Sequence, residues 1–338
     1  MAKLSRAEKR KIKIIVSLSA LFTLVVALFI TNFFVPVIYL TTYIHFRKDL
    51  NSVGQMRVRY IDVGYGDCSL IEFPDGKTML IDGGTGTYGN VYKILNYLNK
   101  SKIKTIDYLV CTSVKSEHCG ALKEIARYKD IGTAYIPYVA NLYITEEYAS
   151  FYKQLLKSGA RVEISEYGKG VYNDEYGYFF GILSPSATTN PDSEYDKMNT
   201  EPTVQNISNA SIVLWLEYAG GGFMFLSDAG AEVQQKIARR LISEENEILI
   251  DGKNVKLSSC AVLKAANHCA NGYTEPFLYD IIEPEASIIS VGKNAQACPS
   301  NAEIANLQLY VQNIYRTDVH GTITVTVNTK GRKISKEK

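Results

Sequence analysis

Histidine is scarce in this sequence. The chain has four histidines among its 338 residues: His45, His118, His268 and His320. A dinuclear zinc site of the usual kind takes four or five imidazoles together with carboxylates. His45 belongs to an apolar N-terminal segment, so three histidines remain for the rest of the chain. A complete dinuclear site of that kind therefore cannot be assembled.

Two side chains that could bind a metal ion, Glu117 and His118, are adjacent in the chain. They stand in the stretch LVCTSVKSEHCGAL, residues Leu109–Leu122. An apolar strand pattern ends there at Thr112, and a helical pattern opens at Gly120. The Glu-His pair is thus predicted to lie in the turn between a strand and a helix.

Motifs for several other chemistries are absent from the sequence. It contains no Walker loop, no Gly-x-Ser-x-Gly elbow and no Rossmann fingerprint. Its six cysteines include no Cys-x-x-Cys, so their spacing does not indicate a metal site, and Cys111 and Cys260 fall in strand patterns as buried apolar residues. The aromatic residues are scattered without basic clusters, which argues against a stacking platform for single-stranded nucleic acid.

The N-terminal segment reads as a membrane anchor. No charged residue occurs from Ile14 to Ile44, a run longer than the ~20 residues that span a bilayer. Six cations precede this run and Arg47 and Lys48 follow it, which places the N-terminus in the cytoplasm. We predict a basic cytoplasmic tail at 1–13, a single-pass transmembrane anchor at 14–46 and a linker at 47–56, with the remaining domain outside the cell membrane.

The charge of the chain is split between this segment and the body. Residues 1–50 hold eight Lys and Arg against two acidic residues, whereas residues 51–338 hold 29 basic and 33 acidic residues. The body therefore has no overall positive field that would collect nucleic acid.

Strand and helix patterns alternate from residue 57 onward. The predicted strands are Val58–Val63, Ser69–Phe73, Thr78–Ile81, Tyr108–Thr112, Thr133–Ile136, Ile212–Tyr218, Phe223–Leu226, Ala261–Lys264, Ser287–Val291 and Thr322–Val327. The predicted helices are Val91–Asn99, Gly120–Tyr128, Glu146–Ser158, Ala231–Ile242, Pro276–Ile282 and Ala302–Val311. This interleaving favours an α/β sandwich over an all-β one.

Three further segments complete the predicted organisation. Ser184–Asn209 is polar and rich in turn formers, which predicts a long surface loop. Ile248–Leu257 is predicted to form a hairpin that turns at Asp251-Gly252. We expect one domain over residues 57–330, followed by a basic C-terminal tail at 331–338.

Seven ordered stretches of the body carry a family resemblance. They are Tyr60–Leu70 (YIDVGYGDCSL), Leu80–Gly84 (LIDGG), Ile106–Leu122 (IDYLVCTSVKSEHCGAL), Asn209–Gly230, Val262–Ala270 (VLKAANHCA), Ile288–Pro299 and Tyr315–Val325. Together they resemble the metallo-β-lactamase-fold domain of ComEC-type competence proteins over essentially all of 57–327. The resemblance implies a four-layer αββα sandwich. It also implies a parent activity of metal-dependent hydrolysis, with phosphodiesters of nucleic acid as the substrate class.

The departures from the family fall at its metal ligands. By this resemblance Ser113 and Lys115 replace two histidines, Glu117 replaces an aspartate, and Asn267 replaces the first histidine of a later pair. In the family the two lost histidines bind one metal ion and the aspartate-histidine pair helps to bind the other. Both ions share a bridging aspartate, which is Asp228 here.

The ligand-type residues that remain allow two interpretations. By resemblance His118, Asp228 and His268 could hold one Zn or Mn ion in an open site, with Glu117 as ligand or base and a bound water as nucleophile. The alternative is a site without metal. Carboxylates buried without a dication repel each other, and an ammonium from Lys115 would compensate their charge.

The resemblance also places three cysteines and three aspartates around the cleft. Cys119, Cys269 and Cys298 could form disulfides, which the outward side of the membrane permits, or could supply a thiolate in place of a lost imidazole. The aspartates Asp62, Asp67 and Asp82 lie in glycine-rich turns. They either orient metal ligands through hydrogen bonds or cap their own turns.

Two functions are thus predicted as alternatives. One is a membrane-anchored, single-metal hydrolase that acts on a phosphodiester, a substrate that the charge of the body does not itself indicate. The other is a metal-free binding or scaffold module of the same fold. An ion pair of Lys115 with Asp228 or with Glu117 would favour the module. Convergence of His118, Asp228 and His268, or of a cysteine in place of one of them, on one point would favour the hydrolase.

Overall fold

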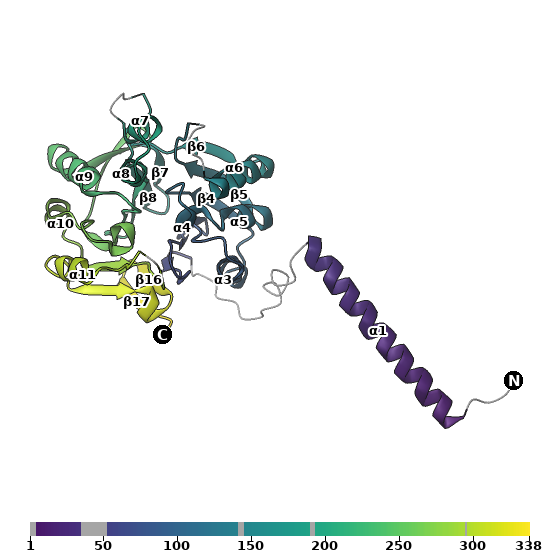
Figure 1. The fold of residues 1–338 in the computed structure, drawn as a ribbon. Helices are drawn as coiled ribbons and strands as arrows, with labels where there is room; N and C mark the ends of the chain where they lie inside the picture. Colours follow the sequence, from purple (N-terminus) through teal and green to yellow (C-terminus); the bar gives the residue numbers. More distant parts are fainter. Residues whose placement is uncertain (1–4, 35–52, 141–144, 190–192, 295) are drawn as a thin grey trace.

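The computed structural model describes residues 5–34, 53–140, 145–189, 193–294 and 296–338. Its first helix, α1, runs from Arg6 to Phe34 and is purple in Figure 1. Among the described residues, no helix has both the length and the apolarity that crossing a bilayer requires. The predicted transmembrane helix is therefore not supported, and residues 35–46 of the predicted anchor lie outside the described residues.

Two β-sheets form the centre of the domain (Figure 1). The strands of the first are β1 (Met56–Tyr60), β2 (Ser69–Glu72), β3 (Thr78–Ile81), β4 (Thr105–Val110), β5 (Asp130–Ile136), β6 (Arg161–Ile164), β16 (Ile323–Asn328) and β17 (Gly331–Lys336). Those of the second are β7 (Gly170–Asn173), β8 (Tyr178–Ser184), β9 (Val213–Tyr218), β10 (Gly221–Phe225), β13 (Cys260–Lys264), β14 (Ala286–Ile289) and β15 (Asn313–Arg316). The strand orders are β17-β16-β1-β2-β3-β4-β5-β6 and β15-β14-β13-β10-β9-β8-β7.

The helices cover the outer faces of the two sheets. The first sheet packs against α3 (Tyr88–Lys100), α5 (Leu122–Tyr128) and α6 (Glu146–Ser158), and the second against α9 (Ala231–Ser243), α10 (Pro276–Ile282) and α11 (Asn301–Leu307). Short helices α4 (Ser116–Cys119), α7 (Glu194–Thr200), α8 (Val204–Asn209), α12 (Thr317–His320) and the 3-10 turn η1 (Ala266–Cys269) lie in the connections.

The apolar core has three parts, one between the two sheets and one between each sheet and its helices, because side chains alternate in direction along the strands. In β3, Met79 and Ile81 pack between the sheets while Leu80 packs against the helices, because successive residues of a strand point to opposite faces. Separate apolar clusters lie between the sheets and beneath each helical layer. The predicted αββα sandwich is thereby confirmed.

Local capping fixes several element ends where the sequence predicts them. Thr145 accepts a hydrogen bond from the backbone N–H of Tyr148 and starts α6, and Gly159, with φ of 75°, ends it. The hairpin of β11 (Glu247–Ile250) and β12 (Lys253–Lys256) turns at Asp251 and Gly252. Their φ angles of 47° and 81° are those of a type I′ turn.

Two predicted segments differ in the structure. Residues 184–209 are not a surface loop, because α7 and α8 form there and bury Tyr195 and Met198. Serine and threonine are common in loops, but here Ser193 and Thr203 are the N-caps of α7 and α8. Residues 331–336, predicted as part of a basic tail, form the edge strand β17 on β16; its exposed lysines are typical of a protected sheet edge.

Gly66 brings the loop after β1 against the turn that carries Glu117. Its φ is 131°, and a Cβ there would lie 2.4 Å from the Glu117 carbonyl oxygen. We predict that Gly66→Ala lowers the free energy of unfolding by about 2–4 kcal/mol, because backbone strain and a steric clash act together. Urea unfolding followed by the fluorescence of Trp215, the single tryptophan, measures this loss.

Gly76→Ala is the matched control. Gly76 also has a positive φ, 88°, but no atom lies within 4 Å of the added Cβ. The expected loss is about 1 kcal/mol, from the left-handed backbone alone. Equal losses in the two variants would contradict the close approach at Gly66.

Candidate functional site

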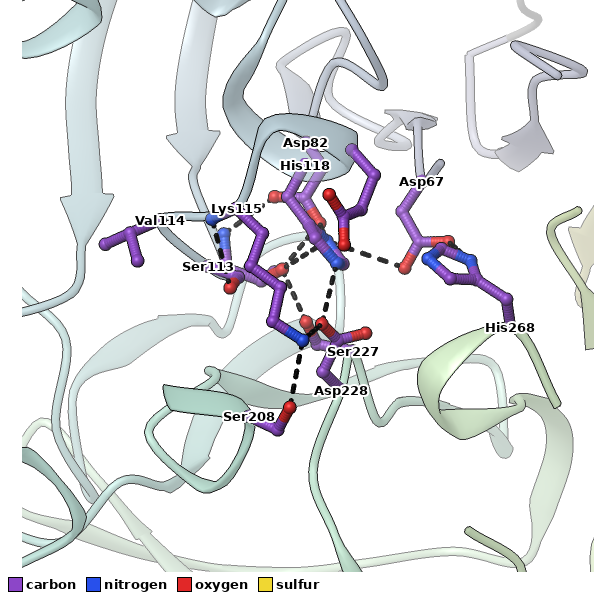
Figure 2. A network of polar contacts seen from close by, with 12 residues as sticks. Asp67, Asp82, Ser113, Val114, Lys115, His118, Ser208, Ser227, Asp228 and His268 are labelled. Carbon is purple, nitrogen blue, oxygen red and sulfur yellow. Dashed lines mark hydrogen bonds and ion pairs between the residues drawn. The ribbon is translucent and has the colours of Figure 1, made fainter. Parts of the chain in front are cut away.

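The candidate site lies where strand ends from both sheets meet (Figure 2). Asp82 directly follows β3, Asp228 comes three residues after β10, and His268 lies in η1 after β13. The parallel pairs β3/β4 and β10/β13 each end on the same side of their sheet. Asp82 and His268 have positive φ angles of 59° and 54°. Such strained backbone is concentrated at functional sites in proteins.

His118 is fully buried between two carboxylates. Its Nδ1 lies 2.9 Å from Oδ2 of Asp82, and its Nε2 lies 3.1 Å from Oδ2 of Asp228. The Nε2 contact is one of charge, since its geometry does not make a hydrogen bond. Burial lowers the pKa of His118, but the nearby Asp228 and Asp82 carboxylates outweigh it and raise this pKa well above its usual value.

Thr112 holds Asp82 in place for His118. The Thr112 backbone N–H donates to Oδ1 of Asp82 at 2.7 Å, and its hydroxyl donates to Oδ2 at 2.5 Å. The same hydroxyl lies 2.6 Å from Oγ of Ser227. This chain of contacts connects the end of the first sheet to the end of the second.

Lys115 and Asp228 form a buried ion pair. Lys115 Nζ donates to Oδ2 of Asp228 and to Oγ of Ser208, both at 2.9 Å. Burial raises the pKa of Asp228, but the charges of His118 and Lys115 hold it well below its usual value. The pair that we predicted for a metal-free site is therefore present.

A second buried ion pair joins Lys264 to Asp67. Lys264 ends β13, its side chain is 3% exposed, and its Nζ contacts Oδ2 of Asp67. Oδ1 of Asp67 lies 3.4 Å from Nδ1 of His268. Burial raises the pKa of Asp67, yet Lys264 and His268 bring it well below its usual value. With protonated His118, the two lysines balance the three buried carboxylates of Asp67, Asp82 and Asp228.

A dinuclear metal centre does not fit these residues. Ser113 is buried and its hydroxyl accepts a hydrogen bond from the Lys115 backbone N–H at 3.4 Å. Lys115 places an ammonium on Asp228, which would have to bridge two ions. Asn267 has an amide where the family resemblance places a histidine, so one more imidazole is missing.

A single cation does fit at Glu117, His118 and His268. One potential ligand atom from each lies within 4.8 Å of the others. Within the described part of the chain, Nε2 of His118 and Nε2 of His268 are buried without a hydrogen-bond partner. Their Nδ1 atoms are engaged, His118 with Asp82 and His268 with the Ser290 carbonyl oxygen at 2.9 Å. Metal-binding histidines in proteins are oriented through their second nitrogen in this way.

This group joins Glu117 to the two histidines, whereas Asp228 is in neither group of described residues although its Oδ2 lies 3.1 Å from Nε2 of His118. The ligand set of His118, Asp228 and His268 stays a prediction. The other group of described residues, Asp67, Asp82 and His118, is a poorer candidate because Lys264 already neutralises Asp67.

The predicted cysteines and Asp62 take other roles. All six thiols are free, and neither cation group of the described residues includes one. Cys119 donates to the Val114 carbonyl oxygen, and burial raises the pKa of Cys119 and of Cys269 to about 12. Cys298 is the one thiol that is not fully buried. Asp62 caps its own turn at the Gly64 N–H, while Asp67 and Asp82 contact the histidines.

Sequence reasoning missed several residues that build the site. Lys264 belongs to the stretch VLKAANHCA, and a lysine within an apolar strand pattern is a signal for a buried, paired charge. Ser208 comes from the segment predicted as a loop, and nothing in the sequence indicates its contact with Lys115. Tyr65 packs against the site, with its ring centroid 4.6 Å from that of His268 and the two rings tilted by 52°.

The Asp67–Lys264 pair gives a test of the charge balance. We predict that Asp67→Asn lowers the free energy of unfolding by about 3–5 kcal/mol, because it leaves a buried ammonium without a counter-charge. Adding Lys264→Met should restore about 1–3 kcal/mol of this loss. Urea unfolding followed by Trp215 fluorescence measures both.

The exposed pair Lys253–Asp174, with side chains 57% and 73% exposed, supplies the control. Asp174→Asn should cost little, since water screens the pair. Additive losses from Asp67→Asn and Lys264→Met would contradict the proposed coupling.

Comparisons with known proteins agree on one family. The family model described as metallo-beta-lactamase superfamily matches residues 61–250. ComE operon protein 3 of Bacillus subtilis (strain 168) is 26% identical over 290 residues. The match covers 81% of this chain and 33% of that protein, so the chain spans about a third of the length of this relative. These findings confirm the resemblance predicted from the sequence.

Solved structures with lower identity are also similar. A mutant of CmlA beta-hydroxylase matches with a TM-score of 0.48 at 11% identity, covering 80% of this chain and 54% of the other. Tm1679, a metal-dependent hydrolase of the beta-lactamase superfamily, matches with a TM-score of 0.45 at 10% identity, covering 79% and 98%.

Proposed function

We propose, from the premise that this chain belongs to the metallo-beta-lactamase superfamily, that its domain is a hydrolase with a single metal ion. The observation that carries the proposal is the pair of buried Nε2 atoms of His118 and His268. Neither makes a hydrogen bond to another described residue, although Nε2 of His118 has a charge contact with Asp228, and both histidines lie near the Glu117 carboxylate. These three residues would hold Zn or Mn. Such an ion, when bound, acidifies a water molecule into a nucleophile at neutral pH.

The neighbouring residues have defined tasks in this proposal. Asp82 holds the His118 ring, and the Ser290 carbonyl oxygen holds the His268 ring. Asp228 stays ionised beside Lys115 and holds the Lys115 ammonium in place. A phosphodiester or other ester is the substrate class that the family resemblance favours.

A metal-free binding or scaffold module is the second candidate. The specific observation in its favour is the ion pair between Lys115 and Asp228. With Lys264 and protonated His118, this pair balances the buried carboxylates without a dication.

Metal stoichiometry separates the two candidates. We predict that the purified full chain, loaded with zinc or manganese in detergent, retains about one equivalent by elemental mass spectrometry. His118→Ala and His268→Ala should each lose the metal, and with it the hydrolysis of a chromogenic phosphodiester. Cys119→Ser is the control, because its buried thiol lies outside both cation groups. No metal in the wild-type chain would support the metal-free module instead.

We also propose that the N-terminal segment attaches the chain to the cell membrane, with its basic end in the cytoplasm and the domain outside. The support is the uncharged run from Ile14 to Ile44 and the exposure of apolar side chains on α1. Leu18 and Phe22, for example, are 60% and 71% exposed. Removing such side chains from water favours insertion into a bilayer.

Membrane attachment can be measured on the full chain. After expression in bacterial cells, we expect the chain to remain in the membrane fraction through alkaline carbonate extraction. The variant Leu18→Lys/Phe22→Lys should move to the soluble fraction, because charged side chains are costly in the bilayer centre. Lys253→Glu, a surface change in the domain, should not. Release of the wild-type chain by carbonate would contradict the proposal.

A further inference from the structure

Lys115 has a hydrogen-bonding capacity that its protein contacts do not use up. An ammonium group carries three N–H donors. Two of them are engaged within the described part of the chain, by Oδ2 of Asp228 and Oγ of Ser208. The Lys115 side chain is 20% exposed, whereas that of Asp228 is fully buried. The third donor is therefore left for a further partner.

A hollow of about 240 Å³ adjoins the elements that hold Lys115. Its lining includes Asn209 of α8, which follows Ser208, and Gly230, two residues after Asp228. The carboxylate in this hollow, Glu232, is paired with Lys197 at 2.9 Å. Its negative charge is thus offset by the Lys197 ammonium.

We propose that Lys115 binds an anionic oxygen of the substrate, a phosphoryl oxygen in a phosphodiester, through its third N–H. Lys115 occupies the position at which the family resemblance places a ligand of a second metal ion. A fixed ammonium there supplies positive charge to the phosphoryl group, and charge-assisted hydrogen bonds are among the stronger polar contacts in proteins. This inference rests on the proposed hydrolase and names the group that receives its substrate.

The position of Lys115 is defined well enough for this task. Asp228 fixes the ammonium from one side and Ser208 from another, so little side-chain freedom remains to be lost on binding. Lys115 is thereby a binding residue for the reacting group as well as the counter-charge of Asp228.

Inorganic phosphate is the probe, titrated into the full chain by calorimetry in both the metal-free and the zinc-loaded form. We expect Lys115→Met to weaken phosphate binding at least about tenfold and Lys115→Arg to stay within about threefold of wild type. Lys123→Met, an exposed lysine of α5, should bind as wild type. The methionine variant should also bind zinc at least as tightly as wild type, because the nearby positive charge is gone.

A second measurement on the unaltered chain guards against a variant that fails to fold. Reductive methylation, followed by peptide mass spectrometry, should modify Lys115 more slowly in the presence of phosphate, while modification of Lys123 stays constant. The proposal is overturned if phosphate protects neither residue, or if folded Lys115→Met binds phosphate as wild type does. Phosphate binding through Lys115 by a chain that takes up no metal would uphold this inference while rejecting the hydrolase.

Discussion

Asp228 is a fully buried carboxylate, and its need for counter-charge organises the site. A buried charge is costly unless cations and hydrogen bonds surround it. Lys115 and His118 meet this need, and each brings a further element with it. Lys115 reaches Ser208 of α8, and His118 reaches Asp82 at the end of β3. The Asp228 carboxylate thus links the loops at the ends of strands from both sheets through Lys115 and His118.

The same contacts set a competition at His118. The carboxylates of Asp82 and Asp228 favour the protonated ring, whereas a metal ion at Glu117 and His268 needs the lone pair of Nε2. Binding of a cation would therefore displace a proton from His118. Lys115 and Lys264 are paired with Asp228 and Asp67, so these two carboxylates do not depend on the His118 proton alone for counter-charge. The two candidate functions differ in whether a metal ion or a proton occupies Nε2 of His118 at neutral pH.

The sequence predicted the fold better than the site. Alternating apolar patterns and capping residues located strands such as β3 and helices such as α6, because these signals are local. The motif order placed His118 and His268 around one cleft, and their ring centroids lie 5.7 Å apart. It could not predict which carboxylate lies close to both rings, since that depends on how the turn with Glu117 and the Lys115–Asp228 pair are placed. The contact of Ser208 could not be predicted because its helix, α8, is too short to show the periodic apolar pattern of a helix.

Anomalous diffraction at the zinc absorption edge, from crystals of the full chain soaked in zinc, would locate any cation bound at the site. We predict one peak, bounded by Glu117 and the Nε2 atoms of His118 and His268, with Lys115 still paired to Asp228. Two peaks sharing Asp228, with Lys115 displaced, would contradict the single-ion site. The absence of any peak among these residues would contradict the metal-dependent function itself.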